Sequence, residues 1–313
     1  MSTPAAGTTK KRLLSRNDYL APLPIPTGEK PLDVLNTIWR KNEVFLDIGY
    51  YSIGSAVMVM WPMVMLFLSL AYGLRNISPE LSTFTLMGGG VITGIPALIL
   101  IHGLFREVPL PIRFNRQRRE VCVPREDGEY WIVPWESVTA IATQQSSVSQ
   151  GGKTSMGLLV IGFDNPDPQA KDDNRHFSVG FNCGGGTTAM ALWECMRSYM
   201  EIGPEAVPEA AALNAGANLR YYIDYMNDKA KERGWVLTLL WEGVFGVFIF
   251  NAPLATYLQR KKLYPPPDLP YPDIIEWSKP LPPEQWAQRS PELEAAIGQR
   301  EAELATQVER ERA

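Results

Sequence analysis

Two long apolar stretches stand out in the pattern of hydrophobic and polar positions along the chain. No charged side chain occurs from Ile48 to Leu74, and His102 is the only titratable group from Leu81 to Phe105. Each stretch is longer than the roughly 20 apolar residues that a helix needs to cross the hydrocarbon core of a bilayer. Because only the short RNISPE link separates them, the pattern predicts a transmembrane helical hairpin within residues 47–105. A buried helix pair in a soluble protein is the alternative interpretation.

Small residues cluster in the second apolar stretch. We expect Gly88, Gly89, Gly90 and Gly94 to let two membrane helices approach closely, as small residues do at helix interfaces in lipid. His102 is a polar group that the prediction places inside the membrane.

Basic residues flank the predicted hairpin on both outer sides, whereas the link contains only Arg75. Lysine and arginine residues near membrane helices remain on the cytoplasmic side. We therefore expect the N-terminus and the segment after Arg106 to be cytoplasmic. The start of the chain is too polar for a signal peptide, so the first membrane helix would itself direct insertion.

Short β-branched and aromatic runs replace the long apolar stretches after Leu110. The runs IRF, EVCV, YWIV, VTAIAT, GLLVIGF and HFSVGF are separated by polar turns, which predicts antiparallel strands. The next segment, CGGGTTAMALWECMRSYMEIG, has apolar residues at helical spacing and predicts one amphipathic helix. Antiparallel strands closed by a C-terminal helix resemble the pleckstrin-homology-like architecture. We expect a cytoplasmic β domain of this kind over residues 106–203.

The densest basic cluster of the chain comes directly after the second apolar stretch. Anionic lipid headgroups attract such juxtamembrane clusters with about 1 kcal/mol per basic residue. The cluster therefore predicts a site for lipid headgroups; a solvated turn that only follows the positive-inside pattern is the alternative. Its members are Arg113, Arg116, Arg118, Arg119 and Arg125.

Other candidate ligand sites have weaker signals. Gly152–Thr154 resembles the end of a phosphate-binding loop, but Ser147 replaces the required earlier glycine and a strand follows, so we interpret it as a hairpin loop. Gly184–Gly186 could hold an anion through backbone amides or simply form a turn. We expect no metal site and no cofactor, since the histidines and cysteines match no known ligand spacing. One acidic loop could bind a divalent cation or be solvated, and it contains Asp164, Asp167, Asp172 and Asp173.

A third apolar run extends from Trp235 to Leu258, inside a predicted helical region over residues 204–262. It contains Glu242, and an ionisable residue within a membrane segment is a candidate functional residue. Basic residues flank the run on both sides, so charge does not orient it. The run either spans the membrane or lies partly inserted at the interface, and we favour the second arrangement.

The two ends of the chain are polar and contain several prolines. Residues 263–313 predict an extended proline-rich segment that follows a surface or recruits a partner, and then a charged helix. Residues 1–46 predict a cytoplasmic tail. The chain as a whole is expected to be a membrane α+β protein.

Composition agrees with an integral protein that has a large aqueous part. The mean hydropathy is −0.12. The formal net charge of −4 argues against a generally basic nucleic-acid binder. The three cysteines all follow the hairpin, and we expect them to be reduced thiols on the cytoplasmic side.

The segment PIRFNRQRREV, followed by IVPWESVTAI, resembles a family of uncharacterised bacterial inner-membrane proteins. The shared feature is a hairpin followed by this β module, and it covers roughly Ile48 to Gly203. Members of that family are often associated with type VI secretion clusters. The resemblance implies a bacterial inner-membrane location and a secretion setting, and it implies no catalytic residues.

Three functions remain open at this point. The first is a non-enzymatic, membrane-anchored binding protein, such as an immunity or accessory factor that holds a toxin or a secretion component. The second is a membrane-perturbing effector in which the apolar helices form a pore. The third is an enzyme with an unrecognised site. We favour the first, with the lipid bilayer and one protein as partners.

Overall fold

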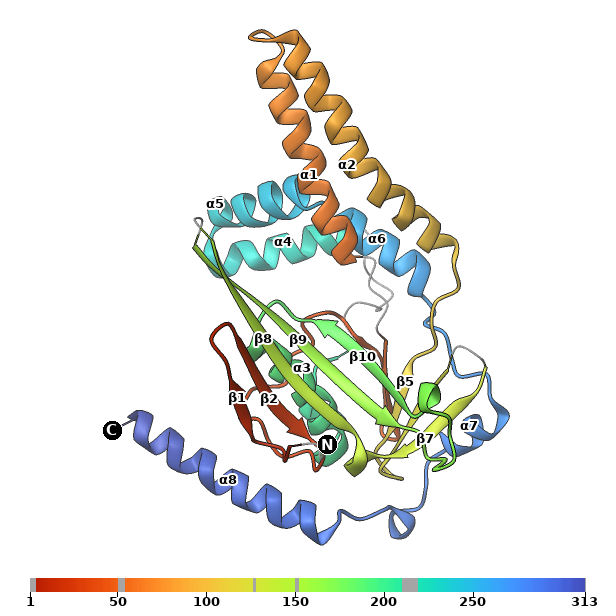
Figure 1. Cartoon of the computed structure of the whole chain (residues 1–313). Coiled ribbons are helices and arrows are strands. Elements are labelled where there is room, and N and C mark those ends of the chain that lie inside the picture. Colours follow the sequence, from red (N-terminus) through yellow and green to blue (C-terminus); the bar gives the residue numbers. More distant parts are fainter. Residues whose placement is uncertain (1–3, 50–53, 126–127, 150–151, 210–218, 313) are drawn as a thin grey trace. The chain divides into compact units, whose positions relative to one another are not determined.

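The computed structural model describes residues 4–49, 54–125, 128–149, 152–209 and 219–312, and these form two compact units. The β unit comprises residues 1–50, 110–211 and 268–313, and the helical unit comprises residues 51–109 and 212–267. Each unit is therefore assembled from segments that are far apart in the sequence, as the colours in Figure 1 show.

Two antiparallel five-stranded sheets form the framework of the β unit. The first sheet has the order β1-β2-β8-β9-β10 and the second has the order β3-β4-β5-β6-β7. The strands of the first sheet are β1 (Thr9–Lys11), β2 (Ser15–Ala21), β8 (Thr139–Ser149), β9 (Gly152–Asp164) and β10 (His176–Asn182). Those of the second sheet are β3 (Ile38–Lys41), β4 (Phe45–Ile48), β5 (Ile112–Asn115), β6 (Glu120–Pro124) and β7 (Tyr130–Pro134).

Helix α3 (Gly186–Glu201) packs on the sheets and completes the main core. Its Trp193 is fully buried and stacks on Trp135, with 5.3 Å between the ring centroids. The backbone of Gly185, just before the helix, passes so close to Gly157 on β9 that a Cβ atom there would lie 2.0 Å from the Gly185 carbonyl. Only glycine at position 157 permits this approach of strand and helix.

The structure differs from the prediction in the first 46 residues. Instead of a tail, they supply β1, β2, β3 and the start of β4. Strand β2 pairs with β8, so that Ser15 lies opposite Gln145 and Ala21 opposite Ala140. Strand β4 pairs with β5, which follows the hairpin. The β unit therefore includes residues outside the predicted domain 106–203. Short strands with distant partners leave a weak local signal, because their stability comes from tertiary packing.

The predicted apolar hairpin is present as α1 (Gly54–Leu74) and α2 (Pro79–Phe105). Ser78 caps α2 by accepting a hydrogen bond from the Leu81 amide, and the Ser82 hydroxyl donates to the Ala71 carbonyl at 2.8 Å, which joins the two helices near their link. Both helices are long and apolar enough to cross a membrane.

The rest of the helical unit contains the third apolar run. It consists of α4 (Leu219–Arg233), α5 (Trp235–Thr238), the π-helical segment η5 (Leu239–Ile249) and α6 (Ala252–Leu263). The α5–η5 helix and α6 meet at an angle of 59°, so the run is broken near Asn251. Among the described residues the helices that could cross a membrane are therefore two, or three if the bent pair counts as one span.

The C-terminal segment belongs to the β unit. It contains α7 (Pro272–Trp277), the short helix η6 (Pro283–Gln285) and the charged helix α8 (Pro291–Arg312). We call residues 268–290 the C-terminal strap, because they follow the surface of the second sheet before α8 begins. Leu293 and Ile297 form the apolar side of α8, and both are buried. Short helices also occur at η1 (Trp135–Ser137), η2 (Asp172–Asn174) and η3 (Pro204–Ala206).

Candidate functional site

The outer face of the second sheet carries a row of charged residues. Arg40 on β3 is opposite Asp47 on β4, and Asp47 is opposite Arg113 on β5. The residues on either side of Asp47 and Arg113 point into the main core, so strict alternation along the strands places these charges on the other face. Cys122 on β6 and Ile132 on β7 continue the same row.

Asp47 and Arg113 form a buried bidentate ion pair. Arg113 donates from Nε to Asp47 Oδ1 at 2.6 Å and from Nη2 to Asp47 Oδ2 at 2.8 Å. Their side chains are 0% and 3% exposed, and the guanidinium lies 3.8 Å from the centroid of the Phe45 ring. Charges so deeply buried are maintained only with full hydrogen bonding.

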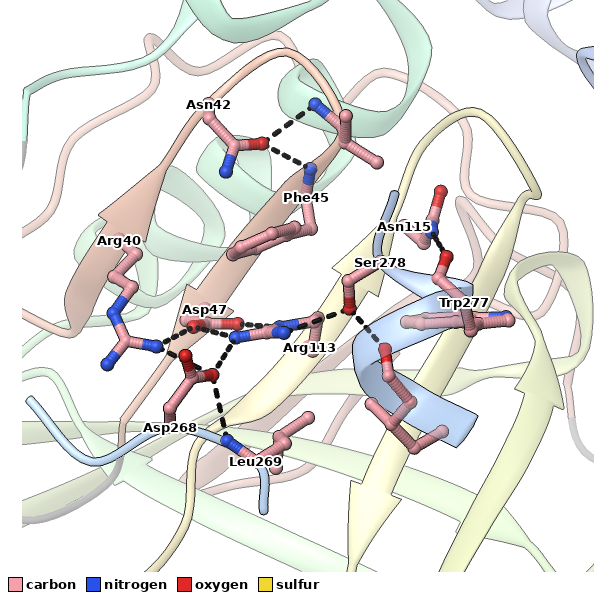
Figure 2. Close-up of polar contacts among 12 residues, drawn as sticks. Arg40, Asn42, Phe45, Asp47, Arg113, Asn115, Asp268, Leu269, Trp277 and Ser278 are labelled. Carbon is pink, nitrogen blue, oxygen red and sulfur yellow. Dashed lines mark hydrogen bonds and ion pairs between the residues drawn. The ribbon is translucent and has the colours of Figure 1, made fainter. Parts of the chain in front are cut away.

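The C-terminal strap completes this ion pair, as Figure 2 shows. Asp268 accepts from Arg113 Nη2 at 2.7 Å and pairs with Arg40 at 2.8 Å. The remaining Nη1 of Arg113 donates to the Ser278 hydroxyl at 2.9 Å. We call Arg40, Asp47, Arg113, Asp268 and Ser278 the strap network.

Burial and charge act in opposite directions on the carboxylates of this network. Burial raises the pKa of Asp47, although the hydrogen bonds and the charge of Arg113 oppose the increase. Partial burial also acts to raise the pKa of Asp268, but the hydrogen bond and charge of Arg113 outweigh it and hold that pKa below its usual value. The strap carboxylate is therefore ionised when it binds.

Apolar residues of the strap cover the other half of the row. Leu269, Ile274 and Trp277 bury Cys122 in a cluster separate from the main core. The Trp277 indole donates to Glu120 at 2.8 Å. The backbone carbonyl of Trp277 accepts from Asn115 and from Arg118 at 3.0 Å each. The strap is held by both polar and hydrophobic contacts.

A second ion cluster fixes the far end of the strap. Glu201 at the end of α3 accepts from Arg119 at 2.9 and 3.1 Å, from Arg289 at 2.6 Å and from the Trp135 indole at 2.7 Å. Glu136 accepts from Arg119 at 3.0 Å and from the Ser290 amide at 3.1 Å. Burial acts to raise the pKa of Glu136, but the hydrogen bonds from Ser290 and Arg119 and the charge of Arg119 lower it overall.

The arginines of the predicted lipid-headgroup cluster all make contacts within the β unit. Arg113 and Arg119 are buried in ion pairs, so they cannot offer their charges to a bilayer surface. Arg118 binds the strap, Arg116 lies over the Trp286 ring, and the Arg125 guanidinium lies over the Trp131 and Phe177 rings. The sequence brings these arginines together, but the structure uses most of them to hold the strap.

The polar residues predicted within the membrane belong to the helical unit. Glu242 on η5 pairs with Arg233 and accepts from the Tyr225 hydroxyl at 3.4 Å. His102 is exposed near the end of α2.

The predicted helix-packing glycines behave differently from one another. A Cβ atom on Gly89 would lie 2.5 Å from Phe67 of α1, so Gly89 permits close contact between the two helices. Gly88, Gly90 and Gly94 have open space around the corresponding position. Only Gly89 of the four therefore supports the hairpin, because the other three lie on other sides of α2.

Reactive groups are sparse in the part of the chain that the structure describes. No group of three or more His, Cys, Asp and Glu residues there could hold a metal ion. On the acidic loop, Asp172 pairs with Arg175 and Asp164 pairs with His176. The thiols are all buried, and burial raises the pKa of Cys122 to about 12 and that of Cys183 to about 11.

Sequence reasoning missed the strap network as a unit. Asp47 and Arg113 each stand between core residues in a short alternating run, and such a charge predicts a buried partner. Their pairing was not visible, because the hairpin separates them in the sequence. Chemically, the network ties the strap to the outer face of the second sheet through charge-assisted hydrogen bonds.

Comparison with protein-family models gives no match, and comparisons with curated proteins and with solved structures likewise give none.

Proposed function

We propose that this chain is a non-enzymatic binding protein that is anchored in a bacterial inner membrane and displays its β unit on the cytoplasmic face. The observation that carries the proposal is the place of the hairpin. It is inserted between β4 and β5, which are paired strands of one sheet, so Ile48 and Ile112 lie opposite each other on either side of the insertion. An anchor placed in this way is joined to the sheet by the chain on both sides of the insertion.

We propose that the β unit is a binding module of pleckstrin-homology-like type. Antiparallel strands in two sheets are closed by α3. Asp47 and Arg113 pair with each other inside the fold, and the strap occupies the outer face of the second sheet. Binding modules of this kind present sheet edges and loops to a partner instead of a catalytic cleft.

The partner that we propose is a protein of a type VI secretion system, with the chain acting as an immunity or accessory factor. The support is the sequence resemblance to that family together with the display of a folded domain at the membrane. The acidic balance of the chain, with a net charge of −4, also favours a protein partner over nucleic acid.

Expression of the tagged full chain in a bacterium tests the anchor and the role together. We expect the protein to remain in the membrane fraction after an alkaline wash, to leave growth unchanged, and to protect the cells when the toxin of a neighbouring gene is co-expressed. Release by the wash would contradict the anchor. Loss of viability under toxin at full expression would contradict the immunity role.

A pore-forming effector is the second candidate. The observation that favours it is the open space around Gly88, Gly90 and Gly94 on α2, which permits helices of other copies to approach. This function predicts that expression depolarises the host membrane, which a potential-sensitive dye measures. An unchanged potential at full expression would exclude it.

A further inference from the structure

Residues 212–267 leave the β unit and return to it, because they connect its parts 110–211 and 268–313. Before the segment, Lys41 donates to the carbonyls of Pro204 and Val207 at 3.0 and 3.1 Å and holds them in the β unit. After the segment, Asp268 binds Arg113 and Leu269 is buried in the cluster around Cys122. Both ends of the segment are therefore fixed to the same folded body.

A folded unit with paired sheets lies on one side of a bilayer, because open sheets cannot be accommodated in hydrocarbon. Any segment that leaves it and returns must cross the membrane an even number of times. The hairpin satisfies this condition with two helices. Residues 208–267 contain a single apolar run, and α4 carries too many charges in its second half to be another span. The number of crossings in this segment is therefore zero.

The geometry of the run agrees with this count. The helix breaks at Asn251, which has a left-handed backbone with φ of 49° and caps α6 by accepting from the Leu254 amide at 3.2 Å. The chain then returns, since Lys262 at the end of α6 donates to the carbonyl of Arg106, directly after α2. The run thus ends next to the end of α2 that leads into the β unit.

The depth of the break follows from a contact with α1. The Trp61 indole donates to the Phe248 carbonyl at 2.9 Å. Trp61 is seven residues after the start of α1 at Gly54, which is about 10 Å along the helix axis. This places the break within one leaflet, well short of the full hydrocarbon thickness of about 30 Å.

The side chains of α5 and η5 suit the boundary between acyl chains and headgroups. No residue of η5 is buried, and its apolar residues are widely exposed. Glu242 is neutralised by Arg233. Lys261 and Lys262 follow the run at its C-terminal end, where anionic headgroups would meet them. At its other end Lys229 and Lys231 form ion pairs with Glu232 and Asp228.

We propose that α5, η5 and α6 form a re-entrant segment, which enters only the leaflet that faces the β unit and binds the headgroup–acyl boundary of an anionic bilayer. The third apolar run is then an in-plane contact surface and not a span. Glu242 links η5 to α4 through its ion pair with Arg233 and is not part of a path for ions. The proposal rests on the membrane anchor proposed above. In this arrangement the N-terminal strands and the strap lie on the same side of the bilayer.

Single-cysteine labelling with a membrane-impermeant maleimide tests the proposal on the full chain. The variants are Asn76→Cys in the hairpin link, Lys231→Cys and Lys261→Cys on either side of the run, and Lys279→Cys on the strap. All four positions are exposed, and the native thiols are buried and weakly reactive. Labelling is compared in spheroplasts and in inverted vesicles, which present opposite faces.

We expect the cysteines at 231, 261 and 279 to be labelled from one side and the cysteine at 76 from the other. Labelling of 231 and 261 from opposite sides would overturn the re-entrant segment and leave the anchor intact. Labelling of all four from both sides would contradict the anchor, and with it the inference. Trp241→Cys adds a test of insertion, because it should stay unlabelled from either side until detergent is added; ready labelling without detergent would mean that the run faces water.

Discussion

Asp47 and Arg113 lie directly opposite each other on adjacent strands, although 66 positions and the entire apolar hairpin separate them in the sequence. Their bidentate ion pair is almost completely removed from solvent. Because Asp268 of the strap binds the same guanidinium, this pair joins three distant segments of the chain.

Removing the charge of Asp47 should destabilise the β unit strongly. Asp47→Asn leaves the buried Arg113 without its main counter-charge, and such a loss typically costs about 3–5 kcal/mol of unfolding free energy. Denaturant unfolding of the full chain in detergent, monitored by tryptophan fluorescence, measures this loss of unfolding free energy. The matched control is Asp172→Asn in an ion pair whose carboxylate is 91% exposed, where we expect less than about 1 kcal/mol. Equal losses in both variants would contradict the role of burial.

The loss of Glu201 should release the far end of the strap. Glu201 accepts from Arg119, Arg289 and the Trp135 indole, so Glu201→Gln weakens three contacts at once. Tryptic cleavage after Arg289 should become about tenfold faster or more, the change that about 1.4 kcal/mol of easier opening produces. Glu294→Gln serves as the control, because this exposed carboxylate binds the same arginine from solvent. The same increase in both variants would argue against Glu201 as the fixing residue.

A methyl group on Gly89 should disturb the hairpin, and one on Gly90 should not. The added Cβ of Gly89→Ala would lie 2.5 Å from Phe67, whereas Gly90→Ala projects into open space. Overpacking of this kind typically costs about 1–3 kcal/mol. Thermal unfolding of the two variants in the same detergent provides the comparison. A midpoint for Gly89→Ala no lower than that for Gly90→Ala would show that α1 and α2 do not touch at this point.

The contribution of Asp268 should disappear at acidic pH. Its pKa in the folded chain lies below the value of about 3.9 expected for the unfolded chain. The stabilisation is therefore fully present above about pH 4 and is lost as the pH falls through the folded pKa. We expect the difference in unfolding free energy between the wild type and Asp268→Asn to be larger at pH 6 than at pH 3. Asp47, whose pKa is raised, acts in the opposite direction but is present in both proteins. A difference independent of pH would exclude an ionised Asp268 as the cause.

The sequence predicted the elements that are locally encoded. The two apolar helices, the antiparallel strands between Ile112 and Asn182, and α3 are confirmed, because each has a continuous periodic pattern. Placement in a membrane stays a prediction. The N-terminal strands were not predicted, since a strand such as β3 has only four residues and is defined by its partner β4.

The candidate site was less predictable than the fold. The arginine cluster was recognised, but its members were assigned to lipid because the sequence does not show that Asp268 and Glu201 reach them. The proline-rich strap was expected to follow a surface, yet that surface depends on the row of residues opposite one another on β3, β4 and β5. Cross-strand neighbours are set by register, and register between distant strands is not written in local composition.

The pairing of β4 with β5 also sets an order of events during translation. When the ribosome has made β4, its partner strand β5 does not yet exist, and the apolar helices α1 and α2 must be synthesised first. The second sheet can therefore close only after the hairpin has left the ribosome, and Arg113 acquires the carboxylate of Asp268 only when that residue emerges, 155 positions later. Synthesis of the apolar hairpin thus precedes closure of the second sheet, and a chain interrupted before residue 268 would lack one carboxylate partner of Arg113.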